Sequence, residues 1–223
     1  MSALGKPLHA IWLGRVAYVD AWRMQEAVAT RVRDGGAERL LLLEHDPVYT
    51  IGRRGTTDHL LVGPDVLRAA GASVYRVDRG GDITYHGPGQ AVGYPILDLR
   101  DWKRDVGAYL RAVEQVMIEA LADFGIAAGR LPGCTGVWVD GRKIGAIGVH
   151  ISRWITSHGF ALNVNTDLSY FGYIVPCGLS RPVTSMAQQG VDAALPHVNA
   201  RLATRFGRVF DREILEPALE KAS

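Results

Sequence analysis

Apolar residues recur every three or four positions in three parts of the chain, which is the spacing of a helix that buries one face. The first predicted helix covers residues 20–34, with Asp20 as its N-cap, and ends before Gly35. The second covers residues 106–124, and the third begins near Pro196. Their expected buried faces are Ala21, Met24, Val28 and Val32; Val106, Tyr109, Leu110, Val113, Val116, Met117, Ala120, Leu121 and Phe124; and Val198, Leu202, Phe206 and Val209.

Shorter runs of leucine, β-branched and aromatic residues predict strands. Two such runs flank Asp140 and Gly141, a dipeptide typical of a two-residue hairpin turn. The other runs are RLLLLEH at 39–45, VYTIG at 48–52, SVYRV at 73–77 and HGFALNVN at 158–165. Because strands come in clusters with helices between them, we expect an α+β fold with a mixed, largely antiparallel sheet flanked by helices. We find no break in the pattern and expect one domain, residues 1–223.

Composition narrows the class of protein. Hydrophobic residues make up 48% of the chain and charged residues 22%, as in ordinary globular proteins. The net charge of +2 is too small to indicate a nucleic-acid partner, and no basic block stands out. Without a signal-peptide pattern or a run of about 18 apolar residues, we expect no membrane association and a cytoplasmic location. The two cysteines form no metal-binding pattern, and we expect them to be reduced there.

The stretch RGGDITYHGPGQ, residues 79–90, contains four glycines among polar residues. Its spacing matches neither the dinucleotide-binding nor the P-loop pattern, so a phosphate-binding loop is excluded on pattern. A tight turn followed by a strand remains one interpretation. The density of hydrogen-bonding side chains favours the other interpretation, a loop that binds a ligand.

Lys143 stands in the apolar stretch GRKIGAIGVH, although the chain has only four lysines among its 25 basic residues. A lysine on a strand can extend its ammonium group to water, so position alone does not indicate function. The adjacent Gly145, Ala146 and Gly148 would leave room for a ligand. Lysine also loses its proton readily when desolvated, which makes it a candidate acid–base group.

Cys177 in GYIVPCGLS and Cys134 in LPGCTGVW have similar glycine- and proline-rich surroundings. Free cysteine is commonly a buried small hydrophobe, whereas a nucleophilic cysteine needs a nearby cation or helix dipole. Local composition therefore does not choose between the two cysteines. The residues alone leave His86, His158 and Lys143 as possible partners of a reactive thiol.

Taken together, RGGDITYHGPGQ, GVWVDGRKIGAIGVHISRWITSHGFALNVN and IVPCGL resemble the lipoyl(octanoyl) transferase family, from LLLLEHDPVYTIGRR to VTS. The resemblance implies a fold shared with lipoate–protein and biotin–protein ligases, and a catalytic pair of Cys177 and Lys143. Cys134 matches no functional position of the family and would be structural. The implied acyl-binding residues are Arg79, Gly80, Gly81, Asp82, Ile83, Thr84, Tyr85 and His86; Ala146, Ile147 and Gly148; and Gly159, Phe160 and Ala161.

The same resemblance implies the reaction and its partners. An octanoyl group would pass from octanoyl-acyl carrier protein, through a thioester on Cys177, to a lysine of a lipoyl domain, with no cofactor or metal. The acceptors would be 2-oxoacid dehydrogenases and the glycine cleavage H protein. Arg53, Arg54 and Arg79 are candidates for contact with the acidic carrier. The alternatives are an ATP-dependent lipoate or octanoate ligase on this fold and a non-catalytic acyl-binding module.

Overall fold

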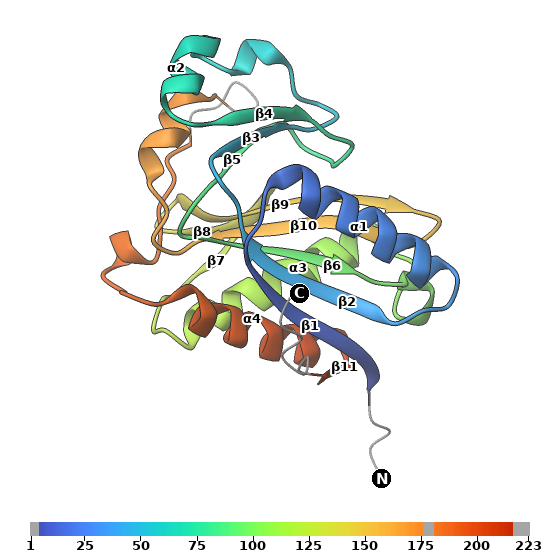
Figure 1. The fold of residues 1–223 in the computed structure, drawn as a ribbon. Helices are drawn as coiled ribbons and strands as arrows, with labels where there is room; N and C mark the ends of the chain where they lie inside the picture. The colour runs from blue at the N-terminus through green and yellow to red at the C-terminus, as the bar shows by residue number, and fades with distance from the viewer. Residues whose placement is uncertain (1–4, 176–180, 216–223) are drawn as a thin grey trace.

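The computed structural model describes residues 5–175 and 181–215, which form two sheets and the helices around them (Figure 1). In the larger sheet β1 pairs in parallel with β2 and β11, and the other neighbours are antiparallel. Its strands, in the order β11-β1-β2-β6-β10-β9-β8-β7, are β1 (Lys6–Arg15), β2 (Glu38–Glu44), β6 (Gln90–Ile96), β7 (Gly129–Leu131), β8 (Cys134–Val139), β9 (Arg142–Ser152), β10 (Ile155–Asn163) and β11 (Arg212–Leu215).

The smaller sheet has the order β4-β3-β5 and lies above one face of the larger sheet in Figure 1. Its strands are β3 (Val48–Ile51), β4 (Ser73–Arg76) and β5 (Ile83–His86). Both sheets are mixed, and most pairs in the larger one are antiparallel, so the fold class expected from the sequence is confirmed.

The leucine run of β2 is apolar at successive positions because both faces of the larger sheet are covered. Leu40 and Leu42 pack in the core that contains α3 and α4, whereas Leu41 and Leu43 pack in the core that contains α1. Successive side chains of a strand point to opposite faces. A strand whose two faces are both covered by helices therefore has apolar residues at successive positions.

The predicted helices are present, with small differences at their ends. The helices are α1 (Tyr18–Arg33), α2 (Pro64–Ala69), α3 (Val106–Ala122) and α4 (Leu195–Phe210), and short 3₁₀ turns cover 57–59, 99–101, 168–173 and 187–189. In α1, Asp20 lies in the first turn and is not the N-cap as we expected, because the helix starts at Tyr18. Met24, expected to be buried, is 40% exposed, and Gln25 is buried in its place.

The second and third helices carry most of the predicted apolar face into the main core. Asp105 caps α3 by accepting a hydrogen bond from the Ala108 backbone N–H. Val106, expected to be buried, is 45% exposed because it occupies the first turn. The remaining buried positions of α3 and α4 include Tyr109, Val113, Val116, Met117, Ala120, Leu121, Val198, Leu202 and Phe206. No helix in the described part of the chain is long and apolar enough to cross a membrane.

Several strands gave no clear signal in the sequence. β6 has the sequence QAVGYPI, in which a glycine and a proline interrupt the β-branched pattern, yet it is buried along its whole length. β11 is the edge strand on one side of the sheet and β1 is next to it, and both carry polar residues. The place of β11 in the sheet depends on pairing with β1, which lies at the opposite end of the described chain.

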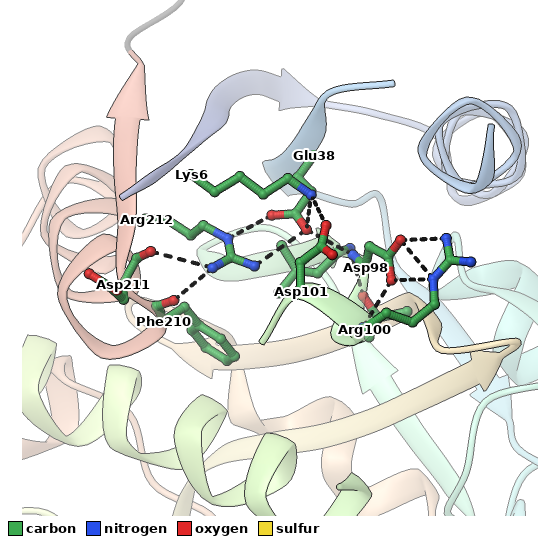
Figure 2. Close-up of polar contacts among 10 residues, drawn as sticks. Lys6, Glu38, Asp98, Arg100, Asp101, Phe210, Asp211 and Arg212 are labelled. Atoms are coloured by element: carbon green, nitrogen blue, oxygen red, sulfur yellow. Dashed lines mark hydrogen bonds and ion pairs between the residues drawn. The ribbon is translucent and has the colours of Figure 1, made fainter. Parts of the chain in front are cut away.

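A cluster of charged side chains holds this edge of the sheet together (Figure 2). The fully buried carboxylate of Glu38 accepts hydrogen bonds from Arg212 Nε at 2.7 Å, from Lys6 Nζ at 3.2 Å and from the Asp98 backbone N–H at 2.9 Å. Lys6 Nζ also donates to Asp101 Oδ2 at 2.7 Å. Glu38 therefore connects β1, β2, β11 and the turn after β6 through one carboxylate.

Glu38→Ala is expected to lower the free energy of unfolding by roughly 3–5 kcal/mol, because it leaves the buried Arg212 guanidinium without its carboxylate partner. Urea unfolding followed by circular dichroism measures this change. Asp65→Ala is the matched control, since it breaks the Asp65–Arg68 pair, whose side chains are 90% and 77% exposed, and should change stability by less than about 1 kcal/mol. Equal effects of the two substitutions would contradict a stabilising role for the cluster.

Candidate functional site

A cavity of about 390 Å³ lies between β9 and β10 of the larger sheet and the glycine-rich segment that leads into β5. This size is within the range of small-molecule sites. The lining includes most of the residues expected from the sequence to bind an acyl group: Arg79, Gly81, Asp82, Ile83, Thr84, His86, Ala146, Ile147, Gly148, Gly159, Phe160 and Ala161. Segments that are distant in sequence are thus brought together around one space.

Two expected acyl-binding residues do not contribute to this lining. Gly80 lies behind it, where its backbone N–H donates to the Val149 carbonyl at 2.8 Å and joins the loop to β9. Tyr85 is 1% exposed and packs against Tyr49 and Tyr170 in the core of the smaller sheet. Tyr85 therefore belongs to the core of the smaller sheet, whereas its neighbours Thr84 and His86 line the cavity.

Glycines at the cavity wall allow backbones and side chains to approach closely. A Cβ on Gly148 would lie 2.8 Å from Arg79 Cδ, and one on Gly159 would lie 2.1 Å from the Gly93 carbonyl oxygen. Real Cβ atoms do not approach other heavy atoms so closely, so a larger residue at either position would displace the wall. The glycines therefore keep the loop and the two strands close around a narrow space.

Arg79 is buried, and its guanidinium is held inside the protein. It donates to the Thr50 carbonyl at 2.6 Å, to Thr50 Oγ1 at 2.8 Å and to the Gly80 carbonyl at 2.9 Å. Our expectation that Arg79 could contact a carrier protein is therefore wrong. Arg53 and Arg54 are exposed, and Arg54 also lines the cavity.

Lys143 lines the other part of the cavity, five residues before Gly148 on β9. Its ammonium lies over the ring of Trp138, with Nζ 4.8 Å from the ring centroid. Arg181 approaches the same side chain, with its guanidinium carbon 5.8 Å from the ring centroid. Lys143 and Arg181 give this part of the cavity a positive character, which favours a negatively charged group.

The histidines that the sequence suggested as thiol partners are already engaged. His86 Nδ1 is 2.8 Å from Gln90 Oε1, and burial lowers the pKa of His86 to about 3. His158 Nε2 is 2.7 Å from Asp78 Oδ1, and this hydrogen bond lowers the pKa of Asp78 to about 2. His86 is thus neutral at pH 7 and cannot supply the cation that a thiolate requires.

The structure bears differently on the expectations for the two cysteines. Cys177 lies outside the described residues, so its pairing with Lys143 stays a prediction. Cys134, which we expected to be structural, is only partly buried and lines the cavity together with Lys143. It is therefore a thiol that any test of the nucleophile must control for.

The sequence did not single out several residues that line the cavity. Asn163 is 5% exposed at the end of β10. It could have been found from the sequence, because it is a polar residue in an otherwise apolar strand. The aromatic residues lacked such a signal because they resemble ordinary core residues. The residues missed in this way are Tyr18, Tyr94, Trp138, Asn163, Phe171, Arg181 and Val183.

Comparison with known proteins gives consistent relatives. Residues 17–207 match the family of the lipoyl protein ligase A/B catalytic domain. The chain is 61% identical over 207 residues to the octanoyltransferase of Solibacter usitatus, covering 92% of this chain and 94% of that protein. It is 50% identical over 210 residues to the octanoyltransferase of Gloeobacter violaceus, and this match covers 93% of this chain and 92% of that protein.

Among solved structures, the chain is similar to a putative lipoate protein ligase from T. acidophilum with bound lipoic acid. The TM-score is 0.77 at 18% sequence identity, and the match covers 96% of this chain and 89% of that one. The lipoate–protein ligase-like fold expected from the sequence is confirmed.

Buried histidines next to the cavity should make stability depend on pH. Burial lowers the pKa of His45 to about 4 and that of His86 to about 3, whereas an unfolded histidine has a pKa of about 6.5. Below pH 6.5 the unfolded chain therefore takes up protons that the folded chain does not. Stability is complete above pH 6.5 and falls as the pH drops toward 4, by about 2 kcal/mol per histidine at pH 5.

Urea unfolding of His45→Gln at pH 7.5 and pH 5 tests this expectation. The substitution should reduce the loss of stability between the two pH values by about 2 kcal/mol. His197→Gln, at an exposed position of α4, is the control and should retain the dependence of the unchanged protein. An unchanged pH dependence in His45→Gln would show that His45 is not the buried neutral group described.

Proposed function

The chain belongs to the octanoyltransferase family, in which residues 17–207 form a lipoyl protein ligase A/B catalytic domain, and from this premise we propose how its residues act. It is an acyltransferase that transfers octanoyl groups in protein lipoylation. The observation that carries the mechanism is the position of Lys143 in the lining of a narrow cavity whose glycine and alanine walls suit a linear acyl chain.

The first half-reaction forms an acyl-enzyme. The Cys177 thiolate attacks the carbonyl carbon of the octanoyl thioester on the carrier, a new sulfur–carbon bond forms, and the bond to the carrier sulfur breaks. The Lys143 ammonium gives its proton to the departing thiolate, so the carrier leaves as a thiol and Lys143 becomes a neutral amine. Exchange of one thioester for another requires no ATP.

The second half-reaction uses the amine that the first one produced. Neutral Lys143 takes a proton from the ammonium group of the acceptor lysine, whose ordinary pKa is about 10.4. The freed amine attacks the Cys177 thioester, an amide forms, and Cys177 leaves as a thiolate. The second amine proton passes to solvent, and Lys143 is again an ammonium group ready for the next carrier.

Lys143 would also stabilise the nucleophile. Lowering a cysteine pKa from about 8.5 to about 6.5 corresponds to about 2.7 kcal/mol of thiolate stabilisation. The position of Lys143 beside Arg181 supports this role, because both cations act on the same part of the cavity.

The octanoyl chain would bind between the Ala146–Gly148 and Gly159–Ala161 segments and the glycine-rich loop. Burial of its seven methylene and methyl groups at about 0.8 kcal/mol each would contribute about 5–6 kcal/mol. The apolar lining of the cavity by Ile83, Ile147 and Phe160 supports this arrangement.

The proposed donor is octanoyl-acyl carrier protein, and the proposed acceptors are lipoyl domains, including those of 2-oxoacid dehydrogenases and the glycine cleavage H protein. Exposed Arg53 and Arg54 near the cavity suit an acidic carrier surface. The cytoplasmic location expected from the sequence stays a prediction.

Lys143→Arg is expected to reduce turnover roughly 100-fold or more, because arginine keeps the charge but cannot release a proton. Steady-state transfer from octanoyl carrier to an isolated lipoyl domain measures the change. Lys103→Arg makes the same exchange at an exposed position and should leave turnover as it is. A Lys143→Arg enzyme with the original rate would rule out the acid–base role.

Intact-protein mass spectrometry after mixing with octanoyl carrier, without nucleotide, tests the thioester. We expect one octanoyl adduct on the unchanged protein and on Cys134→Ser, and none on Cys177→Ala. An adduct that persists in Cys177→Ala and disappears in Cys134→Ser would move the nucleophile to Cys134. Transfer that requires ATP would favour the ligase alternative, and stoichiometric binding without any transfer would favour the acyl-binding module.

A further inference from the structure

A series of hydrogen bonds runs along the buried wall of the cavity, from Arg79 to the strand that carries Lys143. Its members come from the glycine-rich loop, β3, β5, β6, β10 and the segment at 182–184. Every side chain in the series is at least nine-tenths buried: Arg79, Thr50, His86, Gln90 and Asn163. Water therefore does not compete for these bonds, and their donors and acceptors must match within the protein.

The first links fix the protonation of His86. Thr50 Oγ1 accepts from Arg79 Nε at 3.2 Å and from an Arg79 terminal nitrogen at 2.8 Å. The Thr50 hydroxyl proton is then free to point toward His86 Nε2, which is 3.5 Å away. Gln90 Oε1 lies 2.8 Å from His86 Nδ1 and can only accept, so neutral His86 carries its proton on Nδ1 and donates it there. The low pKa of His86 is consistent with this neutral form.

The amide side chains continue in the same direction. Gln90 Nε2 donates to Asn163 Oδ1 at 2.9 Å and to the Tyr85 carbonyl at 3.2 Å. Asn163 Nδ2 donates to the Thr184 carbonyl at 2.9 Å. Turning either amide over would place oxygen against oxygen or donor against donor, so the series allows one orientation only.

The last link reaches the strand of the proposed acid–base residue. Lys143 N–H donates to the Pro182 carbonyl at 2.9 Å, and the Thr184 N–H donates to the Lys143 carbonyl at 2.9 Å. Along this part of β9, β10 has ended, since its last pair is Leu162 with Gly145. The 182–184 segment thus takes the place of β10 next to Lys143, and the Asn163 side chain fastens that segment to the end of β10.

We propose that Asn163 is a positioning residue for octanoyl transfer: by donating to the Thr184 carbonyl it fixes the 182–184 segment against β9 and so aims Lys143 at the reacting groups. The inference rests on the proposed acid–base function of Lys143. Asn163 also lines the cavity, and the proposed role acts through its bond to the Thr184 carbonyl, so it is expected to affect kcat and to change KM little. A displacement of about 1 Å at a catalytic group can cost roughly 100-fold in rate. A small shift of the 182–184 segment against β9 would therefore lower the rate of transfer.

Asn163→Asp tests the proposal because it keeps the shape of the side chain and replaces the donor with a carboxylate oxygen. The backbone bond from Met186 N–H to the Asn163 carbonyl, 3.0 Å, remains to hold the fold. We expect kcat for octanoyl transfer to fall roughly 10- to 100-fold, while KM for octanoyl carrier changes less than about threefold. A variant with unchanged kcat, or with a loss confined to KM, would overturn the proposal.

Asn165→Asp is the matched control. Asn165 also donates through Nδ2 to a backbone carbonyl, that of Ala193 at 2.9 Å, but this bond leads toward α4 and away from Lys143. The control should keep the kcat of the unchanged enzyme. Equal losses in both variants would show that asparagine-to-aspartate exchange disturbs this region generally, and would overturn a specific role for Asn163.

A measurement on the unchanged protein keeps the proposal testable even where Asn163→Asp fails to fold. Nitrogen-15 NMR of the histidine rings at pH 7 should show His86 neutral with its proton on Nδ1. A proton on Nε2, or on both nitrogens, would break the direction of the series and overturn the inference. This result does not depend on catalysis, whereas a Lys143→Arg enzyme with the original rate would refute the acid–base function on which the inference rests.

Discussion

Arg79 carries its charge in the interior, where its guanidinium binds the glycine-rich loop to the smaller sheet. Removing a cation from water costs several kcal/mol unless polar groups replace the lost hydration, and here Thr50 of β3 and the Gly80 carbonyl do so. The Gly80 N–H in turn donates to Val149 of β9. The glycine-rich loop is therefore held between the smaller and the larger sheet, and the narrow cavity exists because this loop cannot move away from β9.

The same constraint separates two chemical environments within one cavity. Near Arg79 the walls are glycine, alanine and neutral histidine, and the cation there is committed to hydrogen bonds inside the protein. Near Lys143, the cationic groups of Lys143 and Arg181 lie beside the Trp138 ring, and both residues line the cavity. An apolar chain and a reacting thioester have these different requirements, and the fold supplies them at different positions along β9.

Much of this could be predicted from the sequence because the signals are local. The leucine run of β2, the periodic face of α3 and the Asp140–Gly141 turn each depend on neighbouring residues, and the structure has a strand, a helix and a hairpin there. The choice of Lys143 came from its rarity among arginines and its small neighbours. The assignment of Cys177 came from resemblance to a family, because local composition treats Cys134 and Cys177 alike.

By itself, the sequence determined the fold class and most of the elements, and its resemblance to a family supplied many of the residues that line the cavity. Tertiary structure alone decided which polar residues line the cavity and which make hydrogen bonds that hold the fold together. It buried Arg79, turned Tyr85 away from the cavity, brought Cys134 into it and connected Asn163 to the strand of Lys143. The physical reason is that a hydrogen bond or a desolvated charge depends on partners that are distant in the chain, whereas helix and strand patterns depend on adjacent residues.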